Sequence, residues 1–557
     1  MGSTLIDRSS VAGRGIPWLL VGAFLALGFS SIMPPAALPI DAPDTEFSAA
    51  RAVEHIEVIA KEPHPMGSTA IIEVRSYLVG ELEKLDLEPE FQTISAPNYF
   101  EDGEPVDVVN IIATIPGSST TGAVALMAHY DTDPPTPGAN DNSAAVATLL
   151  ESGRAILAGP QLRNDVILLF TDSEEPNPRY GSKAFVRESP VFHDIALVVN
   201  LEAIGGSGPS SLVETSGPEA WLVGQYSATA SNPSAFSFIA EITALMGDFG
   251  TDFDPFRNAG VSGFHFAYMR GSPIYHSPAD DLASVGWGSV QHHGSNALGI
   301  ARHFGNLDLG TTPESSESVY FTLRPFFVQY AAPWSLAVAL LAATLLVFGI
   351  ARSVRRRTHA AGSFARSSGI ALLLTLVATF VATLVWLLIV AIRPTPSVLE
   401  AYFYFIVSFG IGAAFVYWLN IRAPIKRRMT GPGFLVLWVA LGLLTAFAAP
   451  GFSALCALPA LAGAIAFNWP TRREDRGAVV RYAFVAAPTV VLLTPAIDFF
   501  FQFGQPRPGN PDSSIPSVAA VAFLLACLVG GLLLGVWRES PGLVETSGRR
   551  DPLPTPQ

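Results

Sequence analysis

The first half of the chain alternates between runs that are apolar at every position and short polar segments that follow them. Such runs are typical of buried parallel strands, because a strand covered on both faces has no polar side. Each run stops just before residues that carry acid or imidazole groups. The three runs are AVALMA before His129, VILLF before the pair Glu174 and Glu175, and IALVVN before Glu202.

Helical periodicity fills the segments between these runs, which is the rhythm of strand and helix found in α/β proteins. The patterns predict a three-layer αβα domain in which helices cover both faces of a mostly parallel sheet. The predicted helices span residues 47–62, 70–86, 143–158, 218–230 and 282–304, and the further predicted strands span residues 90–95 and 107–115.

Most of the second half is apolar over stretches long enough, or nearly long enough, to cross a bilayer as helices. Together with one stretch near the N-terminus they predict a multi-span α-helical membrane domain. The first stretch exceeds the usual core of a cleavable signal peptide, which favours an anchor. The stretches span residues 16–33, 332–351, 369–392, 401–420, 432–449, 452–468, 478–501 and 516–537.

These patterns divide the chain into five predicted regions. We expect a cytoplasmic N-terminus with the first anchor over residues 1–33, the α/β domain over 34–310 and a linker over 311–331. A membrane domain of about seven helices would follow over 332–537, and a disordered cytoplasmic tail over 538–557.

Composition and charge support this division and orient the chain. With 50% hydrophobic and 14% charged residues, the chain is too apolar for one soluble protein. Basic clusters follow the second and fourth stretches and lie between the sixth and seventh, so the positive-inside rule places these loops and both termini in the cytoplasm. The basic residues are Arg352, Arg355, Arg356, Arg357, Arg366, Arg422, Lys426, Arg427, Arg428, Arg472, Arg473, Arg476 and Arg481.

Residues 34–330 would then lie outside the cytoplasm. They carry 13 basic and 38 acidic residues, a net charge of −25, which argues against nucleic acid and anionic lipid headgroups as partners. The two cysteines, Cys456 and Cys527, both fall in apolar stretches, so the exposed domain has no disulfide. No N-x-Ser/Thr acceptor is present. These features favour a bacterial inner membrane with a periplasmic domain, and a vacuolar or endoplasmic reticulum membrane with a lumenal domain is the alternative.

The polar residues at the strand ends supply the ligands that two neighbouring zinc ions need. Two imidazoles, several carboxylates and one acid that can bridge offset the repulsion between two cations. We expect His129 and Glu202 to hold one metal, Glu175 and His276 to hold the other, and Asp141 to lie between them.

Three neighbouring residues are candidates for supporting roles. Asp131 could accept the proton on the second nitrogen of His129 and so fix its tautomer. Glu174, next to a ligand but outside the ligand set, suits a general base. Tyr275 precedes His276 and could polarise a substrate carbonyl, or simply pack in the core. Asp280 and Asp281 are expected to cap the helix near Leu282, with a role beside His276 as the alternative.

These motifs resemble peptidase family M28. The order His-x-Asp, an acid in P-G-A-x-D, a Glu-Glu pair, a further acid and a late histidine is met over roughly residues 45–305. The segments HPMGS (64–68), TSGPEAWLV (215–223), GTDFDPFRNAG (250–260) and IYHSPAD (274–280) are similar to the membrane-anchored branch of the family. Many soluble members carry Asp where this chain has Glu202. The resemblance implies a zinc-peptidase fold, two zinc ions and hydrolysis of a peptide or protein substrate.

The favoured interpretation is therefore a membrane-anchored two-zinc metallopeptidase that acts outside the cytoplasm, most simply as an aminopeptidase. The alternatives are a glutaminyl-cyclase-like or carboxypeptidase activity, or a non-catalytic ectodomain on a membrane bundle. An aminopeptidase needs an acid for the substrate ammonium, for which Glu175, Glu202, Asp252 and Asp254 are candidates. A carboxypeptidase needs a basic residue for the terminal carboxylate. The basic candidates are Arg179, Lys183, Arg257 and Arg270.

Two further sets of residues lie outside the motif. Asp498 is an acid within a predicted membrane span, where acids are often functional. Six histidines outside the motif are expected to be core or surface residues. They are His64, His193, His265, His292, His293 and His303.

Overall fold

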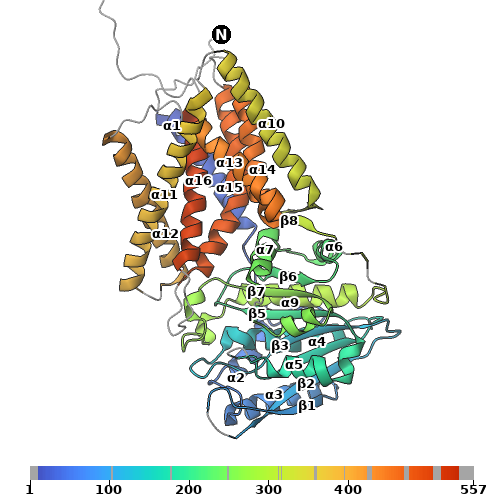
Figure 1. Ribbon diagram of the computed structural model, residues 1–557. Coiled ribbons are helices and arrows are strands. Elements are labelled where there is room, and N and C mark those ends of the chain that lie inside the picture. The colour runs from blue at the N-terminus through green and yellow to red at the C-terminus, as the bar shows by residue number, and fades with distance from the viewer. Residues whose placement is uncertain are drawn as a thin grey trace, which may run out of the picture.

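The structure, a computed structural model, shows an α/β domain at one end of a bundle of long helices (Figure 1). We call these parts the sheet domain (residues 34–331) and the helical bundle (α1 with α10 to α16). The structure describes residues 11–101, 104–175, 178–247, 250–311, 313–314, 316–356, 361–393, 396–422, 430–469, 476–505 and 516–538.

A seven-stranded sheet forms the centre of the sheet domain, with the strand order β1-β2-β4-β3-β5-β7-β6. The four central strands, β4, β3, β5 and β7, run parallel. The edge strands join antiparallel. The bounds are β1 Glu90–Ala96, β2 Val106–Ile115, β3 Ala123–His129, β4 Val166–Thr171, β5 Ile195–Ala203, β6 Ser211–Ser216 and β7 Ser262–Tyr268.

Helices cover both faces of this sheet, which confirms the predicted three-layer αβα class. The apolar strands have two buried sides: Leu126 of β3 packs in the cluster under one helical layer, and Met127 packs in the cluster under the other. The first layer contains α2 Ala49–Ile59, α3 Thr69–Lys84, α4 Ala145–Leu157, α6 Glu219–Thr229 and α9 Trp287–Phe304. The second contains α5 Tyr180–Glu188, the 3-10 turn η2 Pro190–Asp194 and α8 Phe253–Asn258.

Each of the eight apolar stretches forms a helix of the bundle. Five helices of the described chain are long and apolar enough to cross a membrane, and parts of α1, α13 and α16 form shorter apolar helices. The bounds are α1 Val11–Ser30, α10 Pro333–Arg355, α11 Ala361–Ile392, α12 Val398–Arg422, α13 Thr430–Ala448, α14 Ser453–Asn468, α15 Arg476–Phe503 and α16 Pro516–Arg538. The turn η6, Pro450–Phe452, joins α13 to α14.

The segment predicted as a linker differs from expectation. From Ser318 onward it forms an antiparallel hairpin of β8 (Ser318–Leu323) and β9 (Phe326–Ala331), which leads directly into α10. Val319 and Phe321 on one side of β8 are buried in a cluster shared with the bundle, and Tyr320 on the other side is buried in the core of the sheet domain. This alternating burial stabilises a strand at a place where the polar residues before Ser318 had indicated only a linker.

The sheet domain and the bundle share one apolar cluster. Phe236 and Phe238, at the start of α7 (Ser237–Met246), pack there with Leu455 of α14 and Leu492 of α15. The ring of Phe238 also lies 5.7 Å, between centroids, from that of Phe499. The two parts are therefore joined by a packed core as well as by the chain.

Basic residues gather at the end of the bundle that lies away from the sheet domain. Because α10 leaves the sheet domain at Pro333, its last turn with Arg352 and Arg355 lies at the far end, where Arg352 donates to the carbonyl of Asn468. The predicted cytoplasmic residues Arg357, Lys426, Arg427, Arg428, Arg472 and Arg473, and the tail from residue 539, lie outside the described residues.

Candidate metal centre

The parallel strands bring the candidate ligands to one edge of the sheet. His129 is the last residue of β3, and it is paired in register with Thr171, the last residue of β4. Glu174 and Glu175 follow β4 by a few residues, and Glu202 lies near the end of β5, the other neighbour of β3. Carboxyl ends of parallel strands meet at the same edge, so side chains distant in sequence converge there.

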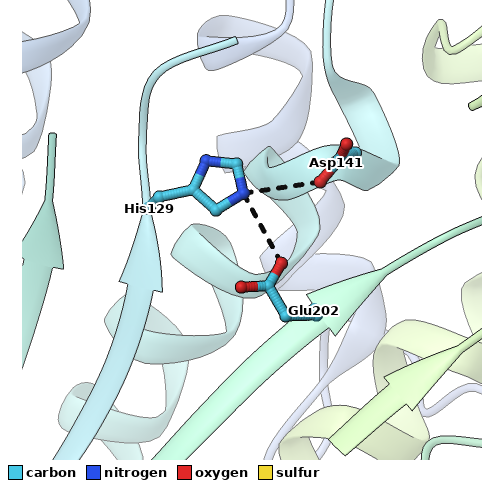
Figure 2. Close-up of side chains that lie close together, drawn as sticks. All are labelled: His129, Asp141 and Glu202. Atoms are coloured by element: carbon cyan, nitrogen blue, oxygen red, sulfur yellow. Dashed lines mark ion pairs between the residues drawn. The ribbon is translucent and has the colours of Figure 1, made fainter. Parts of the chain in front are cut away.

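A first group consists of His129, Asp141 and Glu202 (Figure 2). The Nε2 atom of His129 lies 3.4 Å from Oδ1 of Asp141 and 3.5 Å from Oε2 of Glu202. All three side chains are buried, and their ligand atoms lie within 4.8 Å of one another.

A second group consists of Asp141, Glu175 and His276, with ligand atoms that also lie within 4.8 Å of one another. The Nε2 atom of His276 lies 2.8 Å from Oε1 of Glu175 and 3.4 Å from Oδ2 of Asp141. Asp141 therefore directs one carboxylate oxygen toward each group.

The donor set fits a pair of divalent cations of the zinc type. Each group offers one imidazole nitrogen and carboxylate oxygens, which are ligands that zinc prefers. Oδ2 of Asp141 is buried and has no hydrogen-bond partner. A buried carboxylate oxygen without a donor is costly, and a metal ion at this position would remove that cost. The expected ligands are thus brought together by the fold.

Two asparagines that belong to none of the sequence motifs orient Glu202. Asn142 donates from Nδ2 to Oε2 of Glu202 over 3.0 Å, and Asn200 donates to Oε1 over 3.2 Å. Amide donors on a ligating carboxylate fix its orientation. Asn142 directly follows Asp141, and Asn200 lies two residues before Glu202 on β5, which places both within reach.

Asp280 holds the turn that carries Asp141. Its Oδ1 accepts hydrogen bonds from the backbone and the side chain of Asn140, and its Oδ2 accepts one from the backbone N–H of Asp141 over 3.1 Å. Asp281 instead caps the turn η4 (Leu282–Ser284), where its side chain accepts from the N–H of Ser284. Of the two acids expected to cap a helix, only Asp281 does so.

Asp131 has a different contact from the one expected. The nearest acceptor of the His129 Nδ1 atom is the backbone carbonyl of Asp131 at 3.1 Å, while the Asp131 carboxylate lies 3.5 Å away. That carboxylate accepts hydrogen bonds from the backbone N–H groups of Glu174, over 3.0 Å, and Glu175, over 2.9 Å. Asp131 therefore fixes the turn on which both glutamates lie.

Glu174 lies beside the ligands. Its carboxylate, His129 and Glu175 form a third group whose potential ligand atoms lie within 4.8 Å. The residue is only 6% exposed, and burial raises the pKa of its carboxyl well above the ordinary value. A carboxyl group with a raised pKa accepts a proton more readily than an ordinary carboxyl group.

Tyr275 stacks on His276, one of the candidate ligands. Their ring centroids are 3.7 Å apart and the ring planes are inclined by 20°. Tyr275 also packs against the apolar cluster that the sheet domain shares with the bundle. The geometry therefore gives Tyr275 contact with the ring of the ligand.

Comparison with known proteins identifies the domain that carries these residues. Residues 110–301 match peptidase family M28. The chain carries a peptidase family M28 domain. It is 27% identical to a vacuolar membrane protease of Candida dubliniensis over 53% of this chain and 32% of the relative. It is 27% identical to endoplasmic reticulum metallopeptidase 1 of Mus musculus over 51% of this chain and 32% of the relative. The chain thus spans about a third of the length of these relatives.

Solved structures that are similar to part of this chain include a glutaminyl cyclase from an Acidobacteriales bacterium and a zinc aminopeptidase from Bacillus subtilis. The glutaminyl cyclase is 19% identical to this chain. The match covers 49% of this chain and 99% of the cyclase, with a TM-score of 0.40. The aminopeptidase is 16% identical to this chain. The match covers 46% of this chain and 95% of the aminopeptidase, with a TM-score of 0.38.

The basic residues considered for a terminal carboxylate, and the acids Asp252 and Asp254, form ion pairs or hydrogen bonds. Arg179 contacts Asp254 over 2.6 Å, Arg257 contacts Glu214 and Asp254, each over 2.8 Å, and Arg270 contacts Asp498 of the bundle. Lys183 donates to the carbonyl of Pro178, and Thr171 donates to the fully buried Asp252. Of the six histidines outside the motif, His64, His265, His292 and His293 are buried, His303 is half-buried and His193 is exposed.

Proposed function

We propose that this protein is a membrane-anchored two-zinc metallopeptidase. One observation supports this function above all: Asp141 lies between two groups that each contain a histidine and a glutamate. In this proposal His129 and Glu202 hold one zinc ion, Glu175 and His276 hold the other, and Asp141 contacts both. When bound, the two ions would supply the positive charge that polarises the attacking water and the substrate carbonyl.

Side chains around the two ligand groups supply the proton transfer and the positioning that the reaction needs. Glu174 accepts a proton from the attacking water and delivers it to the amine that leaves when the peptide bond breaks. Asp131 keeps Glu174 and Glu175 on one rigid turn through their backbone N–H groups. Asn142 and Asn200 keep Glu202 in one orientation, so that little rearrangement is needed during the reaction.

We favour an aminopeptidase because the centre has a half-buried acid beside it and its basic neighbours are paired. Asp133 is close enough to His276 and Asp141 for their charges to influence its pKa, which burial raises. Its carboxylate is a candidate for the substrate ammonium, a role for which Asp252 is too deeply buried. The ion pairs of Arg179 and Arg257 weigh against their binding a terminal carboxylate.

The direction of cleavage can be tested with one short peptide offered free, N-acetylated and C-amidated. We expect N-acetylation to abolish cleavage and C-amidation to leave it unchanged, and Asp133→Asn to raise KM for the free peptide. Cleavage that stops on amidation would indicate a carboxypeptidase, and indifference to both changes an endopeptidase. One bound zinc per chain, with cyclisation of N-terminal glutamine, would indicate a glutaminyl-cyclase-like enzyme instead.

We also propose that the sheet domain lies outside the cytoplasm. The positive-inside rule supports this orientation, because the basic residues Arg352 and Arg355 lie at the end of the bundle opposite the sheet domain. A reporter fused after Arg428 should signal from the cytoplasm, and one inserted at Gly310 should signal from the other side. A cytoplasmic signal at Gly310 would reverse the orientation. The same experiment in a bacterial host tests a periplasmic location.

A further inference from the structure

An acid within the bundle binds the loop that carries His276. Asp498 lies near the end of α15 and is 8% exposed. Its Oδ2 accepts hydrogen bonds from Nε of Arg270 over 3.1 Å and from Nη2 over 2.9 Å, and its Oδ1 accepts one from the hydroxyl of Tyr402. A buried ion pair with this geometry is strongly disrupted when one partner loses its charge.

Arg270 begins the segment that leads to the ligand. It follows β7 by two residues, and its backbone N–H and carbonyl exchange hydrogen bonds with Ser207 of the sheet domain. Two residues later, the hydroxyl of Ser272 donates to the carbonyl of Gln502 in α15 over 2.7 Å. The start of the loop is therefore bonded to the sheet domain on one side and to the bundle on the other.

His276 itself needs external support for its conformation. Its φ is 54°, in the left-handed region that residues other than glycine rarely adopt. Such a conformation persists only where the surrounding structure determines it. Tyr275, which stacks on the His276 ring, is separated from Ser272 only by Pro273 and Ile274, and the N–H of Tyr275 donates to the carbonyl of Ser272.

We propose that Asp498 is a positioning residue for His276, so that the helical bundle completes the second ligand group. Two contacts attach α15 to the loop: Asp498 binds Arg270, and the carbonyl of Gln502 accepts from Ser272. These contacts hold the loop where Nε2 of His276 lies close to Asp141 and Glu175. The first ligand group has no such contact with the bundle among the described residues. The inference rests on the proposed function for the metal, but the position of the loop can be measured without it.

The test compares metal binding and loop dynamics in the purified full chain. Asp498→Asn should bind zinc at the second group about 10- to 100-fold more weakly in a chelator competition, while the first zinc stays bound. Hydrogen exchange of residues 270–281 should become faster in the same variant. Ser237→Ala is the matched control, since it removes a hydrogen bond to Gly451 at another contact between sheet domain and bundle, and it should retain both zinc ions.

The proposal would be overturned if Asp498→Asn bound two zinc ions with unchanged affinity and if hydrogen exchange over residues 270–281 were also unchanged. If that variant does not fold, Ser272→Ala, which removes one hydrogen bond of the same anchor, should shift both readouts in the same direction by a smaller amount. No shift in Ser272→Ala would then overturn it. A wild-type chain that binds no zinc would refute the proposed function, and the exchange of residues 270–281 would still decide the positioning role.

Discussion

The two ligand groups of the M28 centre share Asp141 but are held in different ways. His129 and Glu202 lie on neighbouring parallel strands, and the sheet itself fixes their spacing. Glu175 and His276 lie on loops, and each is held by another side chain: Asp131 accepts from the backbone of Glu175, and the adjacent Tyr275 stacks on His276.

The exposure of the two histidines follows the same division. The side chain of His129 is 1% exposed and that of His276 is 16% exposed. A ligand on a buried strand is positioned by the same hydrogen bonds that stabilise the fold, whereas a ligand on a loop is only as well placed as its contacts. We therefore expect the first group to tolerate changes in its surroundings better than the second.

The largest effect should come from Asp141→Ala, because Asp141 is the only ligand common to both groups. We expect this variant to lose both zinc ions and to show background activity, as measured by metal analysis and peptide hydrolysis. Asp281→Ala is the control, since it removes an acid that only caps η4. Retention of two zinc ions in Asp141→Ala would show that the two groups bind metal independently and would contradict the shared role of Asp141.

Glu174→Gln should separate chemistry from metal binding. We expect activity to fall by roughly two to four orders of magnitude, the range for a lost general base, with both zinc ions still bound. The matched variant Glu175→Gln changes the adjacent glutamate in the same way and should instead weaken the second zinc. A Glu174→Gln protein that keeps most of its rate would exclude Glu174 as the base.

The smallest effect should come from Tyr275, whose ring stacks on that of His276. Tyr275→Ala should weaken zinc at the second group by about tenfold, because the histidine loses its stacking partner. Tyr275→Phe should bind as the wild type does if stacking is the role of Tyr275. A loss of rate in Tyr275→Phe with normal zinc affinity would indicate a contact between the hydroxyl and the substrate.

The sequence predicts the first ligand group better than the second. Apolar runs that stop at His129 and before Glu202 indicate strand ends, and strand ends of a parallel sheet meet by geometry alone. The six residues named as ligands or base do come together. The contact of the Asp131 carboxylate with two backbone N–H groups could not be predicted, since it depends on how the β4 turn folds over β3.

Other features could not be predicted from the sequence because they depend on contacts that form only in the tertiary structure. Asn142 and Asn200 lie beside Asp141 and Glu202 in sequence but belong to no motif, and only folding brings the amide of Asn142 to Glu202. It likewise brings the carboxylate of Asp280 to Asn140 and Asp141. The β8–β9 hairpin was missed because its strands are stabilised by two different cores, one of them belonging to the bundle. Asp498 drew notice as an acid in an apolar helix, but its partner Arg270 is 228 residues away in the chain.

The apolar cluster that joins sheet domain and bundle also limits how the two halves of this protein can change in evolution. Phe238 contacts the ring of Phe499 in α15, and Phe321 of β8 lies in the same cluster. A substitution at any of these positions must be accommodated by both halves at once. We expect such residues to vary together among relatives, and a sheet domain grafted onto an unrelated anchor to leave this aromatic surface uncovered and to self-associate.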